Sequence, residues 1–134
     1  MKNYTYARAV QVALIGIAMT GSATLAHADI KDYEFQLIDQ TVKKGDAIIS
    51  VRLVHKPDGK PVPDAVIFAT RLDMAPDGMQ EMATKVAPMS STEPGVYKFK
   101  ATLSMAGRWQ LSLGAKVQGE SGTVENKIVL TAQK

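Results

Sequence analysis

Methionine is the residue type whose chemistry and spacing set this sequence apart. Most of the methionines beyond the N-terminal region crowd into one irregular stretch, residues 74–89, and another closes the next predicted strand: Met74, Met79, Met82, Met89 and Met105. A thioether sulfur is a soft, uncharged ligand that suits Cu(I), whereas Zn²⁺ and Mg²⁺ prefer nitrogen, thiolate or oxygen ligands. Because the sequence contains no Cys, the metal chemistry that it predicts is a Cu(I) site built from methionines.

The predicted ligands are Met79 and Met82, joined by Met74 and Met105. Met79 and Met82 lie in a polar stretch, where a single helical turn would bring residues three apart onto one side. A hydrophobic lid would account for this pair as well as a ligand pair does. Met74 and Met105 adjoin rows of inward-facing residues, so core packing also explains them. Met89 is not included among the predicted ligands.

His55 is the remaining candidate ligand, and it is also the residue that any hydrolytic triad would have to use. It falls at the end of a predicted strand, in phase with the core-facing residues. No G-x-S-x-G motif or phosphate-binding glycine-rich motif accompanies it, and the carboxylates follow no spacing that selects a catalytic pair. These observations favour a binding protein over an enzyme.

Residues 1–28 have the three-part layout of a secretory signal peptide. Lys2 and Arg8 precede an apolar run at residues 9–18, and Ala26-His27-Ala28 supplies a small-residue cleavage site. The run is about half as long as the roughly 20 residues that a membrane span needs. We therefore expect cleavage before Asp29, leaving a mature domain at residues 29–134 with no membrane span. Export without cysteines favours the bacterial periplasm.

The composition fits one ordinary globular domain. The chain has 134 residues, of which 46% are hydrophobic and 22% charged, and its formal net charge is +3. Removal of the leader takes Lys2 and Arg8 with it, so the mature domain is close to neutral. With a single Trp and no interleaving of basic and aromatic residues, the sequence lacks the pattern of a nucleic-acid-binding protein.

Alternating apolar and polar residues predict strands nearly everywhere, and no stretch has the pattern of a long helix. The expected strands are a first one from Tyr33 to near Lys43, and then 47–55, 66–72, a short one at 84–87, 96–103, 109–117 and 124–131. The rest of residues 74–95 is expected to be loop, because Pro, Gly and Ser recur there. About seven short strands with tight turns predict an all-β, immunoglobulin-like antiparallel β-sandwich, with a small barrel as the alternative. Trp109 is expected to be a buried anchor of its strand.

Three motifs resemble the YtkA-like domain family, which is related to FixH proteins. They are Asp73-Met74-Ala75-Pro76-Asp77-Gly78-Met79-Gln80-Glu81-Met82, Pro94-Gly95-Val96-Tyr97 and Met105-Ala106-Gly107-Arg108-Trp109-Gln110-Leu111. The resemblance covers residues 29–134 and implies a small exported immunoglobulin-like domain, found alone or attached to periplasmic parts of heavy-metal efflux systems. It also implies copper handling by the Met-rich segment. Two features depart from the metal-handling relatives: the only His of the mature domain is His55, which belongs to a different strand from the Met cluster, and there is no Met- or His-rich tail.

Two functions from different classes follow from these observations. The first is an exported Cu(I)-binding accessory or carrier that holds one ion in a methionine site and serves an efflux-pump or oxidase-assembly partner. The alternative is an immunoglobulin-like interaction module of a periplasmic or membrane complex. Such a module would add an edge strand to its partner and use the Met-rich segment as an adaptable apolar contact.

Overall fold

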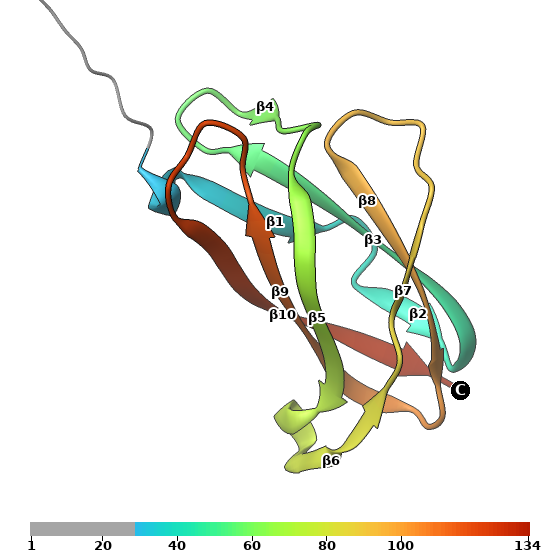
Figure 1. Cartoon of the computed structure of the whole chain (residues 1–134). Helices are drawn as coiled ribbons and strands as arrows, with labels where there is room; N and C mark the ends of the chain where they lie inside the picture. Colours follow the sequence, from blue (N-terminus) through green and yellow to red (C-terminus); the bar gives the residue numbers. More distant parts are fainter. Residues whose placement is uncertain (1–28) are drawn as a thin grey trace, which may run out of the picture.

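The computed structural model describes residues 29–134, which form two packed β-sheets (Figure 1). The first sheet has the order β1-β3-β8-β7, with β4 paired to β3, and the second has the order β2-β10-β9-β5-β6. Two separate sheets confirm the all-β sandwich rather than a closed barrel. Nothing helical within residues 29–134 has the length and apolar character that a transmembrane span requires. The expected signal peptide, residues 1–28, lies outside the described residues.

The strands have the following bounds. The first sheet contains β1 (Tyr33–Leu37), β3 (Gly45–His55), β4 (Lys60–Pro61), β7 (Ala87–Met89) and β8 (Val96–Leu103). The second contains β2 (Thr41–Lys43), β5 (Val66–Met74), β6 (Met79–Thr84), β9 (Gly107–Lys116) and β10 (Thr123–Gln133). Two 3₁₀ turns, η1 (Ile30–Asp32) and η2 (Ala75–Asp77), complete the elements. Neighbouring strands run antiparallel except β2, which is parallel to β10.

The long strands are present where alternation predicts them, with ends that differ by a few residues. The expected first strand is instead divided into β1 and β2, which belong to different sheets. The expected loop at residues 74–95 contains β6 and β7, and the short strand expected at 84–87 spans the gap between them. Gly78, at φ +76°, reverses the chain after η2 and lets β6 run back along β5. Residues 29–134 therefore contain ten strands instead of about seven.

The core lies between the sheets and is made by alternate residues of each strand. The first sheet contributes chiefly Phe35, Ile49, Val51, Leu53, Phe99 and Leu103, and the second chiefly Leu72, Met74, Trp109, Leu111 and Leu130. Trp109 is only 1% exposed, as expected. Its indole N–H donates a hydrogen bond to the carbonyl oxygen of Met105 at 3.1 Å. The core therefore fixes the turn between β8 and β9 as well as strand β9.

Trp109→Ala is expected to lower the free energy of unfolding by about 3–5 kcal/mol, because it empties a buried ring site and leaves the Met105 carbonyl without its partner. Chemical denaturation of residues 29–134 measures the change. Val129→Ala on β10, at a side chain that is largely exposed, is the matched control and should change stability by at most about 0.5 kcal/mol. Equal stabilities for the two variants would contradict the burial of Trp109.

Candidate functional site

The β5–η2–β6 hairpin forms one end of the sandwich and carries three of the predicted ligands, Met74, Met79 and Met82 (Figure 1). Met74 ends β5 and Met79 begins β6, and the two residues are paired across the hairpin. Pro76 within η2 and the left-handed Gly78 after it make the reversal between them. The local sequence thus accounts for the pairing of Met74 with Met79.

Met82 reaches the core because β6 pairs irregularly with β5. Asp73 pairs with Ala83 while Met74 pairs with Met79, so residues 80–82 bulge out of the ladder. In a regular strand, residues three apart would point to opposite faces. Here Met79 and Met82 are both half-buried and both pack against the core. The segment is a strand, β6, and not the polar loop or single helical turn expected from the sequence, and its bulge puts both side chains against the core.

The β8–β9 turn brings Met105 to the same end of the molecule. Gly107, two residues after Met105, lies so close to the hairpin that a Cβ atom there would be 2.5 Å from Met74 Cε and 2.8 Å from Asp77 Oδ2. Met74 is fully buried against this backbone, whereas Met105 is 37% exposed. The end of the sandwich therefore combines one buried, two half-buried and one partly exposed thioether from two loops.

An ion pair holds the two loops together. Arg108 donates three hydrogen bonds to the hairpin, each of 2.8 Å: from its backbone N–H to Asp77 Oδ2, from Nε to Asp77 Oδ1, and from Nη2 to the Pro76 carbonyl. The backbone bond and then the guanidinium bond lower the pKa of Asp77 below its usual value. Sequence reasoning missed Asp77 and Arg108, because only the strand register brings them together. The one sign in the sequence that could have pointed to these two residues is that both belong to the motifs quoted above.

Asp73 fixes the start of the 3₁₀ turn from inside the hairpin. It is buried, and its carboxylate accepts hydrogen bonds from Arg71 Nε at 2.6 Å and from the Ala75 N–H at 3.0 Å. The Arg71 guanidinium also donates to the Gln80 carbonyl at 3.0 Å, which ties β5 to the bulged part of β6. Asp73 therefore sets the shape of the hairpin, and both of its oxygens already have partners.

His55 lies at the other end of the sandwich and does not join the methionines. Gly45, at the start of β3, pairs with Leu103 beside the Met105 turn, and His55 ends β3. At about 3.3 Å per residue, the length of β3 separates them by roughly 33 Å. His55 Nδ1 lies 3.1 Å from Asp58 Oδ1, and its ring centroid lies 5.0 Å from that of Tyr33. The structure thus does not support the expectation that His55 completes the methionine site.

The surroundings of His55 are explained by local packing. The Tyr33 hydroxyl donates a hydrogen bond of 2.8 Å to Glu120 Oε2, which links β1 to the turn between β9 and β10. Burial, followed by the neighbouring Glu120 carboxylate, raises the pKa of Tyr33 to about 12. Residues 29–134 contain no group of three or more His, Asp or Glu side chains arranged to hold a metal ion. Of the predicted ligands, Met74, Met79 and Met82 share the β5–η2–β6 hairpin, whereas His55 lies elsewhere.

Met89 is separate from the other methionines. It lies on β7 and is 39% exposed, beside a groove between β5 and β8 rather than at the hairpin end. Its partner in the sheet is Lys98. The structure therefore divides the Met-rich segment into a clustered group and one isolated residue.

Comparisons with known proteins gave a family match and several structural neighbours. The model of the family described as YtkA-like matches residues 27–114. Similar solved structures include the Lin-41 filamin domain (17% identity, 76% of this chain and 92% of that chain, TM-score 0.45). A DUF4426 family protein from Pseudomonas aeruginosa is also similar (13% identity, 76% of this chain and 91% of that chain, TM-score 0.46). So is the ZirS C-terminal domain (11% identity, 92% of this chain and 88% of that chain, TM-score 0.48). No curated protein sequence matches the chain.

Asp77→Asn is expected to lower the melting temperature at neutral pH, because the variant loses the charge that Arg108 holds. Since folding lowers the pKa of Asp77, the stabilisation is complete above the ordinary carboxyl pKa and disappears as the pH falls through the lowered value. The difference in melting temperature between wild type and variant should therefore shrink in acid. Glu125→Gln, at an exposed carboxylate on β10, is the control. A difference that does not depend on pH would contradict the ion pair.

Proposed function

The chain belongs to the YtkA-like family, and from that premise we propose that it is an exported accessory protein that carries Cu(I) as cargo. The ion would be held by methionine sulfurs at the hairpin end of the sandwich. Met79 and Met82 would be the principal ligands, with Met74 and Met105 in support. The protein would act as a carrier rather than a catalyst.

The observation that carries this proposal is the convergence of two loops that are distant in sequence. The hairpin supplies Met74, Met79 and Met82, and the Arg108–Asp77 ion pair holds the turn that supplies Met105 against it. Neutral sulfur donors suit a soft monovalent ion, and two or three of them can bind Cu(I) without a thiolate. Because the sequence contains no Cys, thioethers are the sulfur donors that it can offer to Cu(I).

The gradient of exposure supports a carrier that exchanges its ion. Met105 is the most exposed of the four thioethers and Met74 the most buried. An incoming ion would meet Met105 first, and a partner's sulfur ligand could replace Met105 first during release. Each exchange would keep the ion in contact with at least one sulfur and shield it from water.

The destination of the ion follows from the predicted signal peptide and the family resemblance. Export to the periplasm would place the domain beside an efflux pump or an oxidase-assembly protein, and either could accept Cu(I) from it. Association with a pump would remove copper from the compartment, whereas association with an assembly factor would deliver it to an enzyme. The methionine site serves both roles by the same ligand exchange.

Replacement of Met79 and Met82 by Leu tests the site. Met→Leu keeps volume and hydrophobicity at a usual stability cost under about 1.5 kcal/mol, so that only the sulfur is lost. Titration of residues 29–134 with Ag(I), or with Cu(I) under reducing conditions, should show saturable binding by wild type. The Met79→Leu/Met82→Leu variant should fold normally and bind at least tenfold more weakly. Met74→Leu or Met105→Leu should weaken binding further.

Two substitutions serve as matched controls. Met89→Leu removes a sulfur that lies outside the cluster, and His55→Gln removes an imidazole at the far end of the sandwich; neither should change the affinity. The proposal fails if wild type shows no saturable binding. It also fails if the double variant binds as tightly as wild type, or if His55→Gln alone abolishes binding.

A further inference from the structure

Strand β5 has a free edge over more than half of its length. On one side it pairs with β9 from Val66 to Asp73. On the other side β6 reaches only Leu72–Met74 and leaves the sheet after Thr84. No other strand of the described chain pairs with Val66–Arg71. Backbone N–H and C=O groups along this edge are therefore available to a further strand.

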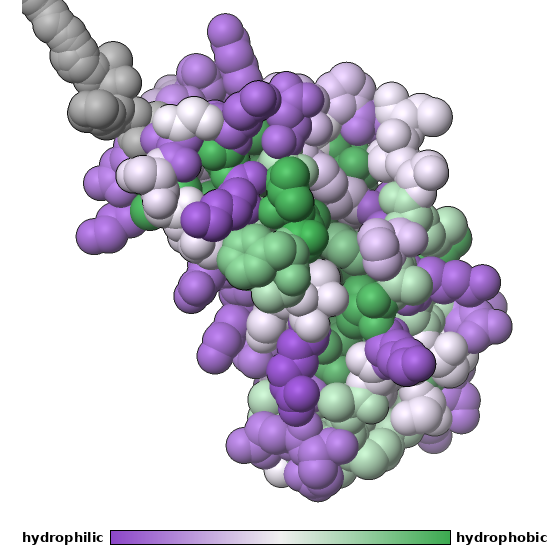
Figure 2. Space-filling view, in the orientation of Figure 1, coloured by the Kyte–Doolittle hydropathy of each residue, from purple (hydrophilic) through white to green (hydrophobic). Residues whose placement is uncertain are grey.

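The side chains on this edge lack the usual protection against pairing. Residues 66–70 carry no charge, although exposed edges are commonly guarded by charged side chains. Val66 is 64% exposed and Phe68 is 57% exposed. The register of β5 against β9 shifts between Ile67 and Ala69. At this shift the Phe68 ring lies on the outer surface, close to Gly114. Figure 2 shows hydrophobic side chains gathered in the middle of this face, over β5.

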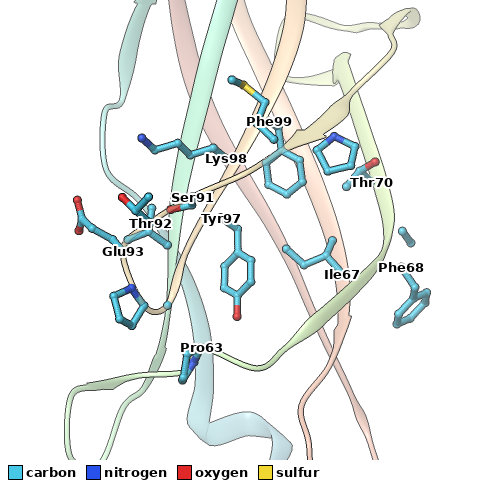
Figure 3. Close-up of a pocket in the computed structure, with 16 residues that line it drawn as sticks. Pro63, Ile67, Phe68, Thr70, Ser91, Thr92, Glu93, Tyr97, Lys98 and Phe99 are labelled. Carbon is cyan, nitrogen blue, oxygen red and sulfur yellow. The ribbon is translucent and has the colours of Figure 1, made fainter.

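A groove follows the free edge toward the first sheet. Its volume is about 490 Å³, and it lies between β5 and the β7–β8 segment. Ile67, Tyr97 and Phe99 point into it, whereas Phe68 points away from it (Figure 3). The Ser91 hydroxyl in its wall is buried and has no hydrogen-bond partner among residues 29–134. The sandwich is thus open along one side, at the place where a strand next to β5 would lie.

We propose that the Val66–Arg71 edge binds an extended segment of a partner protein, which adds to the sheet antiparallel to β5. The segment would occupy the row that β6 leaves after Thr84. Alternate side chains of a strand point to opposite faces, so one set would enter the groove over Ile67, Tyr97 and Phe99. The other set would pack beside Phe68. Backbone hydrogen bonds would supply affinity and the groove would supply selectivity.

The charges around the groove specify the partner segment further. Glu93 lies toward the Pro63 end of the groove, and Lys98 lies nearer its Phe99 end (Figure 3). Asp64 directly follows Pro63 in the sequence. A segment antiparallel to β5 begins at the Arg71 end. It is therefore complementary when it has an acidic residue near its start, apolar residues at alternate positions, and a basic residue near its end.

A second copy of this chain fits the edge less well. The exposed parts of Val66 and Phe68 offer on the order of 200 Å² of apolar surface, given that a whole aromatic side chain buries 150–250 Å². A stable interface between two proteins buries about 1,200–2,000 Å² in total. Edge-to-edge contact of two copies would leave both grooves empty, whereas an extended segment fills the groove and satisfies the backbone.

The docked segment would begin beside the methionine hairpin, because β5 continues from Arg71 to Met74 and pairs there with β6. A partner held in this way would have its chain within reach of Met82. The docking proposal does not depend on metal binding, so the two can fail separately. The Met79→Leu/Met82→Leu variant should retain docking, and variants of the edge should retain Ag(I) binding.

The test uses a synthetic peptide as the probe, acetyl-Asp-Val-Thr-Val-Thr-Val-Lys-amide, titrated into ¹⁵N-labelled residues 29–134. We expect saturable shifts of the backbone amides, largest at Val66–Arg71. Phe68→Lys and Val66→Lys should each weaken binding at least tenfold. Ile48→Lys, at an apolar residue on β3 that is 53% exposed, is the matched control and should bind as wild type does. The two edge variants check each other if one of them does not fold.

A second peptide, N-methylated at alternate residues on its β5-facing side, keeps the side chains but removes backbone donors. It should bind at least tenfold more weakly than the first. Equal binding of the two peptides would overturn strand addition. Amide shifts that centre elsewhere, or the absence of saturable binding, would also overturn the proposal. Self-association of the free protein through Val66–Arg71, with no binding of the peptide, would identify a second copy as the occupant instead.

Discussion

The close approach of Gly107 to the β5–β6 hairpin is the contact on which this end of the sandwich depends. Gly107 has φ +145°, and a side chain there would collide with Met74 and Asp77. The absence of a Cβ lets the next residue, Arg108, donate its backbone N–H to Asp77. Core burial of Trp109 then anchors the same turn from inside. The β8–β9 turn is therefore held by steric fit, by an ion pair and by the hydrophobic core. The chain has no disulfide that could hold it instead.

The regular part of the fold was predictable because burial imposes a period of two on each long strand. Trp109 and its neighbours on β9 alternate between core and solvent, so that the sequence reveals both the strand and its inner face. The short strands could not be found in this way. β2 is held by pairing with β10, far away in sequence. In β6 the bulge destroys the alternation on which the prediction depends. Tertiary contacts, rather than local preference, decide such segments.

The candidate site was predictable only in part, for a related reason. Met74 and Met79 meet through a local turn that Pro76 and Gly78 predict from the sequence. The approach of the β8–β9 turn, which carries Met105, to this hairpin and the Asp77–Arg108 pair both depend on which strands are neighbours. His55 is an example. The alternation along β3 indicates that its side chain faces the core, but alternation does not tell which end of the sandwich a residue occupies. That depends on strand direction and length.

The division of the first predicted strand between two sheets has a mechanical consequence. β1 pairs with β3 in one sheet, and the chain then crosses to the other sheet, where β2 runs parallel to the C-terminal strand β10. Thr41, Val42 and Lys43 pair with Thr131, Ala132 and Gln133. When the two ends of the domain are pulled apart and β1 has detached from β3, the force pulls the parallel strands β2 and β10 lengthwise past each other. Their hydrogen bonds then bear the load together instead of opening one by one. The crossing strand thus acts as a clamp against stretching of the domain.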